Sequence, residues 1–558
     1  MVKRILNLLN IEISGLHEAA YLLGLFTFLS QVLALFRDKL LAHSFGAGDV
    51  LDMYYSAFRI PDFVFISVAS IVSISVLIPF LVKKIDSNFV DSRKFIDSIF
   101  SLFIISIIAV SIVLFFLVPY INRIILPGFS ESSISQISLM TRILLLSPIL
   151  LGISNLFAGI TQVHRRFLVY ALSPLLYNLG IIVGILFFYP IWGNKGLVFG
   201  VIFGALMHLL VQIPSVSKVG FLPRFTFNIL WRDIKEVVML SLPRALTLAS
   251  SQIILIFLIG FASVMTVGSI SVFNFSLNLQ SVPLAIIGVS YSVAAFPTLS
   301  RLFSSGNEKK FLSQIVTATR HIIFWSIPTV VLFVVLRAQI VRVILGSGEF
   351  SWSDTRLTAA SLALFALSVT AQSLVLLFVR GYYATGNTKK PLIINMFSAL
   401  ITICLTYLLY NLFLNTNTFK FFLESLFRVD GLVGTDVLIL PLSYSLGSIL
   451  NMSLLWISFQ KNFKKFSLDV LETFVHSLSS AVIMGFVAYQ FLVIFGNVFD
   501  INTFWGILSQ GFLSGIIGIM VGIFILKLLK NKELSEIQKA IHKKFWKTEA
   551  VIPEQRRL

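Results

Sequence analysis

The sequence has few charged residues for its length. Asp, Glu, Lys and Arg make up 12% of the 558 residues, whereas 57% are apolar and the mean hydropathy is +0.93. Soluble proteins usually have about a quarter of charged residues, so this composition excludes an ordinary soluble fold. The apolar residues come in long runs rather than in alternation, which argues against a membrane β-barrel. The sequence therefore indicates a helical membrane protein.

Cysteine and metal-binding patterns are also scarce. The single cysteine, Cys404, excludes a disulfide framework and a cysteine metal site, and we expect it to be a small buried apolar side chain. The seven histidines lack metal-ligand spacing, and there is no GxxxxGK[ST] loop and no HExxH motif. We therefore predict no metal site, no catalytic residues and no enzymatic activity, and we do not expect direct ATP hydrolysis to be the energy source.

The long apolar runs predict about fourteen membrane-spanning helices. Each run can cross a hydrocarbon core of about 30 Å. The predicted spans are 19–43, 53–82, 96–120, 134–161, 167–190, 196–216, 236–263, 268–300, 311–336, 357–384, 391–413, 437–460, 471–495 and 503–529.

Positive charge alternates from loop to loop. The formal charge of +18 comes mostly from every second loop, which leaves no reason to expect a nucleic-acid partner. The basic loops contain Lys83, Lys84, Arg93 and Lys94; Arg165 and Arg166; Lys218, Arg224, Arg232 and Lys235; Arg301, Lys309 and Lys310; Lys389 and Lys390; and Lys461, Lys464 and Lys465. This pattern predicts that both termini are cytoplasmic.

The two ends of the chain are expected to lie on the membrane surface. Residues 1–18 have apolar residues interrupted by polar ones, unlike a cleavable signal peptide, and predict a cytoplasmic interfacial helix. In the tail, residues 531–558, apolar residues recur at helical spacing among lysines, which predicts an amphipathic helix on an anionic cytoplasmic surface. Its apolar residues are Leu534, Ile537, Ile541 and Phe545.

The chain also resembles itself. The sequence at 30–33 recurs at 251–254, and Leu156-Phe157 recurs as Leu377-Phe378, both at an offset of 221 residues. The shared offset favours two six-helix lobes related by a pseudo-two-fold axis, although shared hydropathy alone is an alternative. We place the lobes at 19–216 and 236–460, with a cytoplasmic linker at 217–235 and two additional helices within 461–530. Two-lobed proteins of this kind usually transport a substrate by rocking one lobe against the other.

Charged residues in or near the spans are the candidate binding residues. Arg37 and Asp38 end the apolar run 22–36, and a charge at such depth costs several kcal/mol unless it has a partner or a cavity. They form either an ion pair that anchors the helix end or an arginine fork that binds phosphate oxygens. For Arg59, Arg244 and Arg380, which lie near helix ends or prolines, anchoring and substrate contact both remain open. Prolines in apolar runs predict kinks at Pro61, Pro79, Pro148, Pro174, Pro243, Pro283 and Pro297.

An ordered series of motifs resembles the MurJ (MviN) lipid II flippase family. It covers about residues 20–460. The series includes SQVLALFRD at 30–38, FGAG at 45–48, AFRIP at 57–61, Asn178, LVQIP at 210–214, LPR at 242–244, FPTLS at 296–300, GEF at 348–350 and Arg380.

The resemblance implies an all-α transporter of the multidrug, oligosaccharidyl-lipid and polysaccharide exporter superfamily, in a bacterial cytoplasmic (inner) membrane. Its members move a polyprenyl-pyrophosphate-linked saccharide from the cytoplasmic to the outer leaflet by alternating access, for peptidoglycan synthesis. A cationic cavity would hold the head group, and a groove formed by the last two helices would hold the lipid tail. Membrane lipids and cell-wall synthesis proteins are the other implied partners.

This chain departs from the family at several positions. Gln31, Phe65 and Asn278 stand where the family usually has arginine, and Ser70 replaces an acidic residue. Arg37 is the family cavity arginine that stays in place, with Arg59 and Arg244 as partial substitutes. Thr402 and Thr406 stand at the positions that resemble the family's sodium-site region, and no carboxylate is among them. A coupling ion and the membrane potential therefore both remain open as the energy source of transport.

The leading hypothesis is a lipid II flippase without a cofactor. We expect Arg37 to bind the head group, Asp38 to orient it, and Gln31 and Asn278 to be polar cavity contacts. The alternatives are a flippase for another polyprenyl-linked glycan, an ion-coupled small-molecule exporter of the same superfamily, and a membrane scaffold that transports nothing.

Overall fold

The residues described by the computed structural model are 16–69, 80–81, 84, 89–463 and 468–546. They form helices joined by loops, and this described part contains no β-strand. It forms two compact units, each made of three segments. Unit 1 comprises Met1–Val282, Ile344–Phe365 and Asn387–Asn451, and unit 2 comprises Pro283–Val343, Ala366–Gly386 and Met452–Leu558. The division into lobes at 19–216 and 236–460 stays a prediction.

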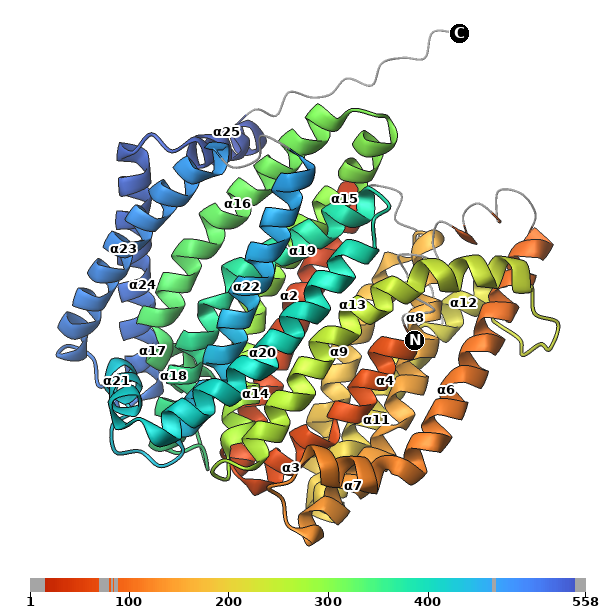
Figure 1. Cartoon of the computed structure of the whole chain (residues 1–558), viewed down its shortest axis with the longest axis horizontal. Coiled ribbons are helices and arrows are strands. Elements are labelled where there is room, and N and C mark those ends of the chain that lie inside the picture. Colours follow the sequence, from red (N-terminus) through yellow and green to blue (C-terminus); the bar gives the residue numbers. More distant parts are fainter. Residues whose placement is uncertain (1–15, 70–79, 82–83, 85–88, 464–467, 547–558) are drawn as a thin grey trace. The chain divides into compact units, whose positions relative to one another are not determined.

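Unit 1 holds most of the helices of the first half of the chain (Figure 1). They are α2 (Leu16–Phe45), α3 (Asp49–Ala57), α4 (Arg59–Ala69), α6 (Phe89–Ile125), α7 (Glu131–Leu144), α8 (Leu146–Val163), α9 (Phe167–Val183), η2 (Gly184–Phe188), α10 (Tyr189–Trp192), α11 (Asn194–Leu210), α12 (Ile213–Val219), α13 (Trp231–Ser263) and α14 (Ser269–Pro283). From the second half come α18 (Trp352–Ala366), α20 (Lys389–Asn415), α21 (Asn417–Phe427), η4 (Thr435–Leu438) and the first part of α22 (Ile439–Asn462).

Unit 2 contains the C-terminal helices and two earlier segments. They are η3 (Leu284–Val289), α15 (Ser290–Ser304), α16 (Glu308–Val335), α17 (Arg337–Ile344), α19 (Ser368–Ala384), the rest of α22, α23 (Leu468–Gly496), α24 (Phe504–Leu528) and α25 (Lys532–Trp546).

The described residues contain most of the spanning helices predicted from the sequence. Among the described residues, 11 helices are long and apolar enough to cross a membrane, or 12 if the bent pair α18 and α19 is one span. The first predicted span coincides with α2, whose 30 residues extend about 45 Å at a rise of about 1.5 Å per residue. The second begins in α3 and α4 and continues into residues outside the description. The predicted all-α polytopic fold is confirmed.

Two of the predicted kinks coincide with breaks between helices. Pro61 and Pro148 lie in the first turns of α4 and α8, directly after the breaks at Phe58 and Leu145, where the missing N–H is not needed. The second break lies inside the candidate span Glu131–Val163. Pro174, Pro243 and Pro297 do lie inside helices, and Pro283 is followed by the π-helical turn η3. Pro79 lies outside the described residues.

The 221-residue offset has a counterpart in the packing of unit 1. Helix α2 packs on α9, and α13 packs on α20. Adding the offset to α2 and α9 gives ranges that overlap α13 and α20. The same pairing therefore occurs twice, as a sequence repeat predicts.

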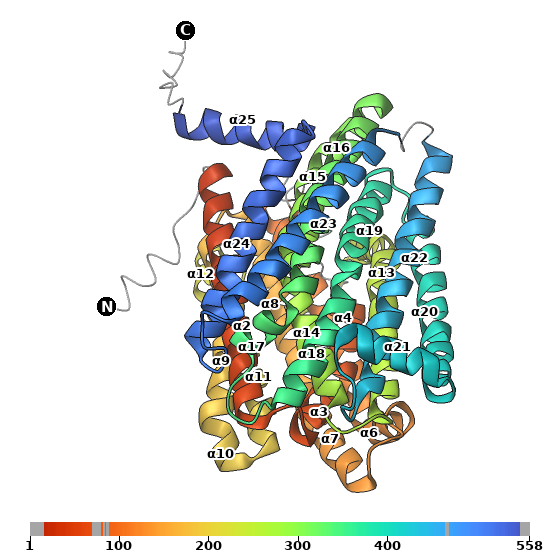
Figure 2. The same cartoon turned by 90° about the vertical axis from the view of Figure 1, so that its left-hand side faces the viewer.

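Helix α25 is attached to its own unit, where it lies across the end of α24 (Figure 2). The Glu533 side chain is 1% exposed and accepts hydrogen bonds from Arg320 Nε at 2.6 Å and Thr473 Oγ1 at 2.7 Å. Burial opposes its ionisation, but the bonds from Thr473 and Arg320 outweigh burial and lower the pKa of Glu533. Leu534 is buried against Phe324 and Leu526, so this predicted membrane contact is a protein contact instead.

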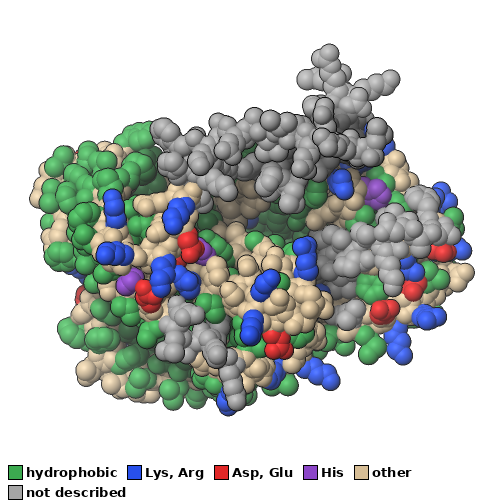
Figure 3. Space-filling view, turned by 90° about the horizontal axis from the view of Figure 1, so that it is seen from above, with side chains coloured by type: hydrophobic (Ala, Val, Ile, Leu, Met, Phe, Trp, Pro, Cys, Tyr) green, Lys and Arg blue, Asp and Glu red, His purple; other side chains and the backbone are tan. Residues whose placement is uncertain are grey.

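Basic side chains are exposed on the face of unit 2 that carries α25. Figure 3 looks onto this face, where Lys and Arg side chains are more frequent than Asp and Glu. The exposed cations of unit 2 here include Lys527, Lys530 and Lys532. The predicted cations Lys83, Lys464, Lys465 and Lys547 lie outside the described residues, as do residues 1–15.

Cys404 is exposed, so its predicted burial is wrong. It lies on α20 between Leu400 and Leu408, which are 60% and 62% exposed. A spanning helix presents apolar side chains to lipid as well as to protein, so hydropathy alone does not predict burial in a membrane protein.

Glycines allow α9 and α11 to touch backbone to backbone. A Cβ atom on Gly180 would lie 2.2 Å from the Cα of Gly204, and one on Gly200 would lie 2.4 Å from the Cα of Gly184. Gly196, Gly200 and Gly204 recur every fourth residue, the spacing that puts small residues on one face of a membrane helix. The two helices therefore pack more closely than any side chain would permit.

We expect Gly200→Ala to destabilise the protein by about 1–3 kcal/mol, because the new methyl group meets backbone that cannot rotate away. The measurement is the midpoint of thermal unfolding of the purified protein in detergent. Gly24→Ala is the matched control, since nothing lies within 4 Å of a Cβ there. Equal midpoints for the two variants would contradict the close packing of α9 on α11.

Candidate functional site

Arg37 is held by two partners in unit 1. Its Nε and Nη2 atoms donate to Asp38 Oδ1 at 3.0 and 2.7 Å, and Nη1 donates to Asn178 Oδ1 on α9 at 2.9 Å. A guanidinium has five N–H donors, so these contacts leave two for a ligand within the described part of the chain. The side chain is 19% exposed and is therefore still accessible.

Asp38 connects this pair to a third helix. It is 3% exposed, and its second oxygen, Oδ2, accepts a hydrogen bond from Asn278 Nδ2 on α14 at 3.1 Å. The structure thus brings together three of the predicted site residues, Arg37, Asp38 and Asn278, and adds Asn178. We call these four residues the Arg37 network. A buried carboxylate needs this degree of pairing, because its desolvation costs several kcal/mol.

Helix α14 carries a row of polar side chains toward α2, α3 and α4. Ser271, Asn274 and Asn278 are spaced three and four residues apart, which places them on one face of the helix. Each of the three binds a charged residue from the start of the chain. We call these three residues the α14 polar row.

The middle member of the row binds Arg59. Arg59 is 7% exposed, and its Nη2 atom donates to Asn274 Oδ1 at 2.5 Å while Nε donates to the Tyr55 carbonyl at 3.2 Å. Asn274 in turn donates to the Ile270 carbonyl at 2.7 Å, which fixes the orientation of the amide. Two of the five N–H donors of Arg59 are thus bound by protein partners in this conformation.

Ser271, the first residue of the α14 polar row, binds Asp52. Asp52 lies directly before the predicted span 53–82. Its oxygens accept from Ser271 Oγ at 2.6 Å, Ser271 N at 2.8 Å and Gly268 N at 2.6 Å. Asp52 is 4% exposed, so these three hydrogen bonds replace the bonds to water that its carboxylate loses on burial. The charges of Asp52 and Asp38 balance those of Arg37 and Arg59, so these four residues do not make a strongly cationic cavity.

Backbone contacts close unit 1 beside Asp52. Gly46, Gly268 and Gly348 all have positive φ angles, of 60°, 94° and 60°. A Cβ on Gly46 would lie 2.6 Å from the Glu349 carbonyl oxygen, and one on Gly268 would lie 2.3 Å from the Ala47 carbonyl oxygen. Only glycine combines this backbone conformation with such an approach, so these loops fit tightly together at the ends of α2, α14 and α18.

The remaining predicted residues lie outside the Arg37 network. Gln31 is half-buried on α2 and shares a helix face with Asp38, seven residues away. Arg244 is half-buried on α13 after Pro243, also in unit 1. Arg380 is half-buried on α19 and belongs to unit 2, so the structure does not place it in this site.

The other residues at which this chain departs from the family lie away from the Arg37 network or outside the described residues. Phe65 packs against the apolar core of unit 1, and Ser70 lies outside the described residues. The hydroxyls of Thr402 and Thr406 donate to the carbonyls of Ser398 and Thr402, at 2.7 and 2.8 Å. Groups of three or more His, Cys, Asp or Glu side chains that could hold a metal ion are absent from the described part of the chain.

Asn178, Asn274 and Asp52 were not predicted as site residues from the sequence. The available signal was the spacing of Ser271, Asn274 and Asn278 in an otherwise apolar helix. A polar side chain at membrane depth needs a partner, so three on one face indicate a polar surface opposite.

The comparisons agree on one family. The family described as "Lipid II flippase MurJ" matches residues 41–509. A "Probable lipid II flippase MurJ" from Buchnera aphidicola subsp. Schizaphis graminum is 27% identical, over 93% of this chain and 98% of its own length. One from Thermotoga maritima is 28% identical, over 93% of this chain and 97% of its own length.

Solved structures show the same fold. "Lipid II flippase MurJ, inward closed conformation" aligns with a TM-score of 0.71 at 23% identity and covers 93% of this chain and 100% of that one. An inward-facing multidrug resistance MATE family transporter of the MOP superfamily aligns with a TM-score of 0.59 at 16% identity, over 78% and 96% of the two chains.

The Arg37 network generates a stability prediction. Arg37→Gln removes the cation beside buried Asp38, and we expect a loss of about 3–5 kcal/mol, because an unpaired charge stays buried. Adding Asp38→Asn removes that charge and should restore much of the loss. Thermal unfolding in detergent measures both.

Arg123→Gln serves as the control, since the pair of Arg123 with Glu131 is exposed and should contribute nothing measurable. A double variant at least as unstable as Arg37→Gln alone would show that Arg37 does not compensate Asp38.

Proposed function

This chain belongs to the MurJ family of lipid II flippases, and we propose that it moves lipid II, a lipid-linked cell-wall precursor, between the leaflets of a bacterial cytoplasmic membrane. The observation that carries the proposal for this chain is the Arg37 network. It supplies an accessible guanidinium at the end of the apolar run 22–36 within α2, oriented by a buried carboxylate. This is the chemistry that a lipid pyrophosphate requires.

The geometry suggests how Arg37 binds a phosphate while it keeps its hydrogen bonds to Asp38 and Asn178. Asp38 contacts Nε and Nη2 of the guanidinium, and Asn178 contacts Nη1, so the plane of the group is fixed before a substrate arrives. The two remaining N–H donors can bind phosphate oxygens without breaking these bonds. A preoriented donor costs less entropy on binding than a flexible one.

The α14 polar row suggests how the site alternates. In this conformation Asp52 and Arg59 are bound to Ser271 and Asn274, and the loops beside them are closed by glycine contacts. Opening this end requires those bonds to be exchanged for water or substrate. The bonds join charged to neutral groups, so they are weaker than buried ion pairs and can be broken in each cycle.

Translocation of a polyprenyl lipid with a different head group is the second candidate function. Asn278 and Gln31 offer neutral amides where the family usually has arginine, and the charged residues of the site balance. Amides bind sugar hydroxyls as both donors and acceptors, so another polyprenyl-linked glycan fits this site as well. The coupling ion is not assigned, and Arg244 and Arg380 remain candidates for substrate contacts in other conformations.

We expect the chain to restore lipid II translocation in a bacterium depleted of its own lipid II flippase. Lipid II should become accessible to an externally added cleaving enzyme with the wild type, and this exposure should be lost with Arg37→Ala. The pair Arg37→Gln with Asp38→Asn should also fail although it is more stable than Arg37→Gln alone, because the cation is missing. Membrane levels of each variant are measured in parallel.

Arg123→Ala is the matched control and should translocate normally. Full exposure with Arg37→Ala would refute the role of Arg37. Wild-type protein at normal levels without any exposure would favour another glycan lipid, and failure with every glycan lipid would favour the scaffold.

The basic loops predict the orientation. The test introduces one cysteine at a time into a Cys404→Ala background. Ser132→Cys lies at the start of α7, and Ser217→Cys lies at the end of α12, beside Lys218. Both side chains are exposed. An impermeant maleimide should label Ser132→Cys in intact cells and Ser217→Cys only after permeabilisation. The reverse pattern would invert the predicted topology.

A further inference from the structure

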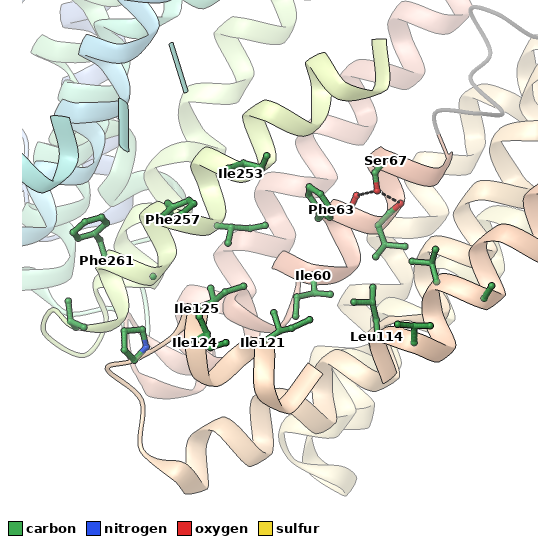
Figure 4. A pocket seen from close by; sticks show the side chains of 18 residues that line it. Ile60, Phe63, Ser67, Leu114, Ile121, Ile124, Ile125, Ile253, Phe257 and Phe261 are labelled. Atoms are coloured by element: carbon green, nitrogen blue, oxygen red, sulfur yellow. Dashed lines mark hydrogen bonds between the residues drawn. The ribbon is translucent and has the colours of Figure 1, made fainter. Parts of the chain in front are cut away.

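Helix α6 lines a cavity on each of two opposite faces. One, of 930 Å³, lies among α4, α6 and α13 of unit 1, and Figure 4 shows Leu114 and Ile121 of α6 along it. We call it the α4–α13 cavity. The other, of 640 Å³, lies among α6, α7 and α8 of the same unit, and we call it the α6–α8 groove. Its α6 residues fall on the other side of the helix and are Ile108, Ser111, Ile112, Phe115 and Phe116.

The two cavities differ in their polar groups. In the α4–α13 cavity, Ser67 has the one polar side chain among the described lining residues, and its hydroxyl donates to the Phe63 carbonyl at 2.6 Å. In the α6–α8 groove, Ser111 is 8% exposed, and its hydroxyl has no hydrogen-bond partner within the described part of the chain. Arg142 adds a cation to the same groove. The groove therefore has polar groups left for a ligand, whereas the cavity has none.

Arg142 is a cation inside the candidate span Glu131–Val163. Its Nε atom donates to the Phe115 carbonyl at 2.8 Å, and its guanidinium carbon lies 4.9 Å from the centre of the Phe115 ring. Among the described residues it has no further hydrogen bond and no carboxylate partner, so its four Nη N–H donors are available. Arg37, by contrast, is paired with Asp38. A guanidinium within a span costs several kcal/mol unless a partner approaches it, and an anion is the strongest partner.

The polar groups of the groove follow the order of the groups in a phospholipid. Phe115, which holds Arg142, lies ten residues, about 15 Å, from the end of α6 at Ile125. Ser111 lies about one turn further from that end, and Ile108 about one turn further again. From the helix end inward, the groove therefore offers a cation for a phosphate, a hydroxyl for an ester oxygen and an apolar wall for an acyl chain.

The groove is open on its outer side. Ile112 and Phe116 of α6 are 56% and 67% exposed, and Leu146 of α8 is 51% exposed. Exposed apolar side chains within a span face lipid, and anionic phospholipids are the phosphates that a bilayer supplies. A guanidinium binds phosphate oxygens through two parallel hydrogen bonds.

We propose that the α6–α8 groove binds an anionic phospholipid of the bilayer, with its phosphate at Arg142 and an acyl chain along α6. This lipid is a resident ligand on the outside of unit 1 and is distinct from the transported substrate. The inference is therefore independent of the proposed function.

The test uses the purified full-length protein in phosphatidylcholine nanodiscs. The probes are a phosphatidylglycerol and a phosphatidylcholine with identical acyl chains, each with a diazirine in one chain. After illumination, mass spectrometry locates the labelled peptides. We expect phosphatidylglycerol to label α7 and α8 about tenfold more than phosphatidylcholine does, as one charge-assisted hydrogen bond would produce. The α4–α13 cavity is the internal reference, and both probes should label α4 and α13 equally because its described lining has no charge.

Arg142→Gln should remove the preference for phosphatidylglycerol. Arg123→Gln, which removes an exposed cation from the same helix α6, is the matched control and should keep it. Ile112→Trp fills the groove with the cation intact and should abolish labelling of α7 by both probes. Val113→Trp, on the α4–α13 face, should leave that labelling unchanged. Unfolding midpoints in detergent establish that each variant is folded, and Ile112→Trp tests the groove if Arg142→Gln does not fold.

Three results would overturn the inference. They are equal labelling of α7 by both probes, a phosphatidylglycerol preference of the same size at α4 and α13, and a preference that persists in Arg142→Gln. Soluble glycerol 1-phosphate separates the lipid from its anion and should not reduce the labelling, because it has no acyl chain to bury. Full competition by glycerol 1-phosphate would show a site for the free phosphate and refute the lipid.

Discussion

The cost of burying charge in a membrane determines how the helices of unit 1 are arranged around Arg37. A carboxylate that is 3% exposed and a guanidinium at the end of an apolar run both need partners, and the described part of the chain supplies them from three helices. The neighbouring contacts of Asp52 and Arg59 follow the same rule. Because the bonds to Asn178 and Asn278 join segments more than a hundred residues apart, satisfying these charges also fixes the tertiary contacts of α2, α9 and α14.

The spanning helices could be predicted from the sequence because their signal is local. A run of about 20 apolar residues is sufficient evidence for a span, and the described helices overlap these runs closely. Arg37 and Asp38 could be predicted for the same reason, since they are adjacent and interrupt such a run. The prolines were ambiguous, because Pro61 and Pro148 are equally compatible with a kink and with a helix start.

The partners of the charged residues could not be predicted in the same way. Asn178 and Asn274 lie 141 and 215 residues from the arginines that they bind, and no local pattern specifies such pairs. The burial of Cys404 was wrong because lipid and protein are equally apolar neighbours for a membrane helix. The family resemblance identified Asn278 as a replaced arginine but not its contact with Asp38. Arg380 was predicted as a site residue from its motif, but the motif match did not specify its spatial neighbours, and the structure does not place it in the Arg37 network.

The glycine contacts between α9 and α11 have a mechanical consequence for the polar site. With backbone against backbone along successive turns, no side chain is available to deform between the two helices. The two helices therefore behave as one rigid body. Asn178 belongs to this body, because it lies on α9 two residues before Gly180. Under the proposed function, a movement of Arg37 on binding its substrate would reach α9 and α11 together through the Asn178 amide, so a local contact would displace both helices.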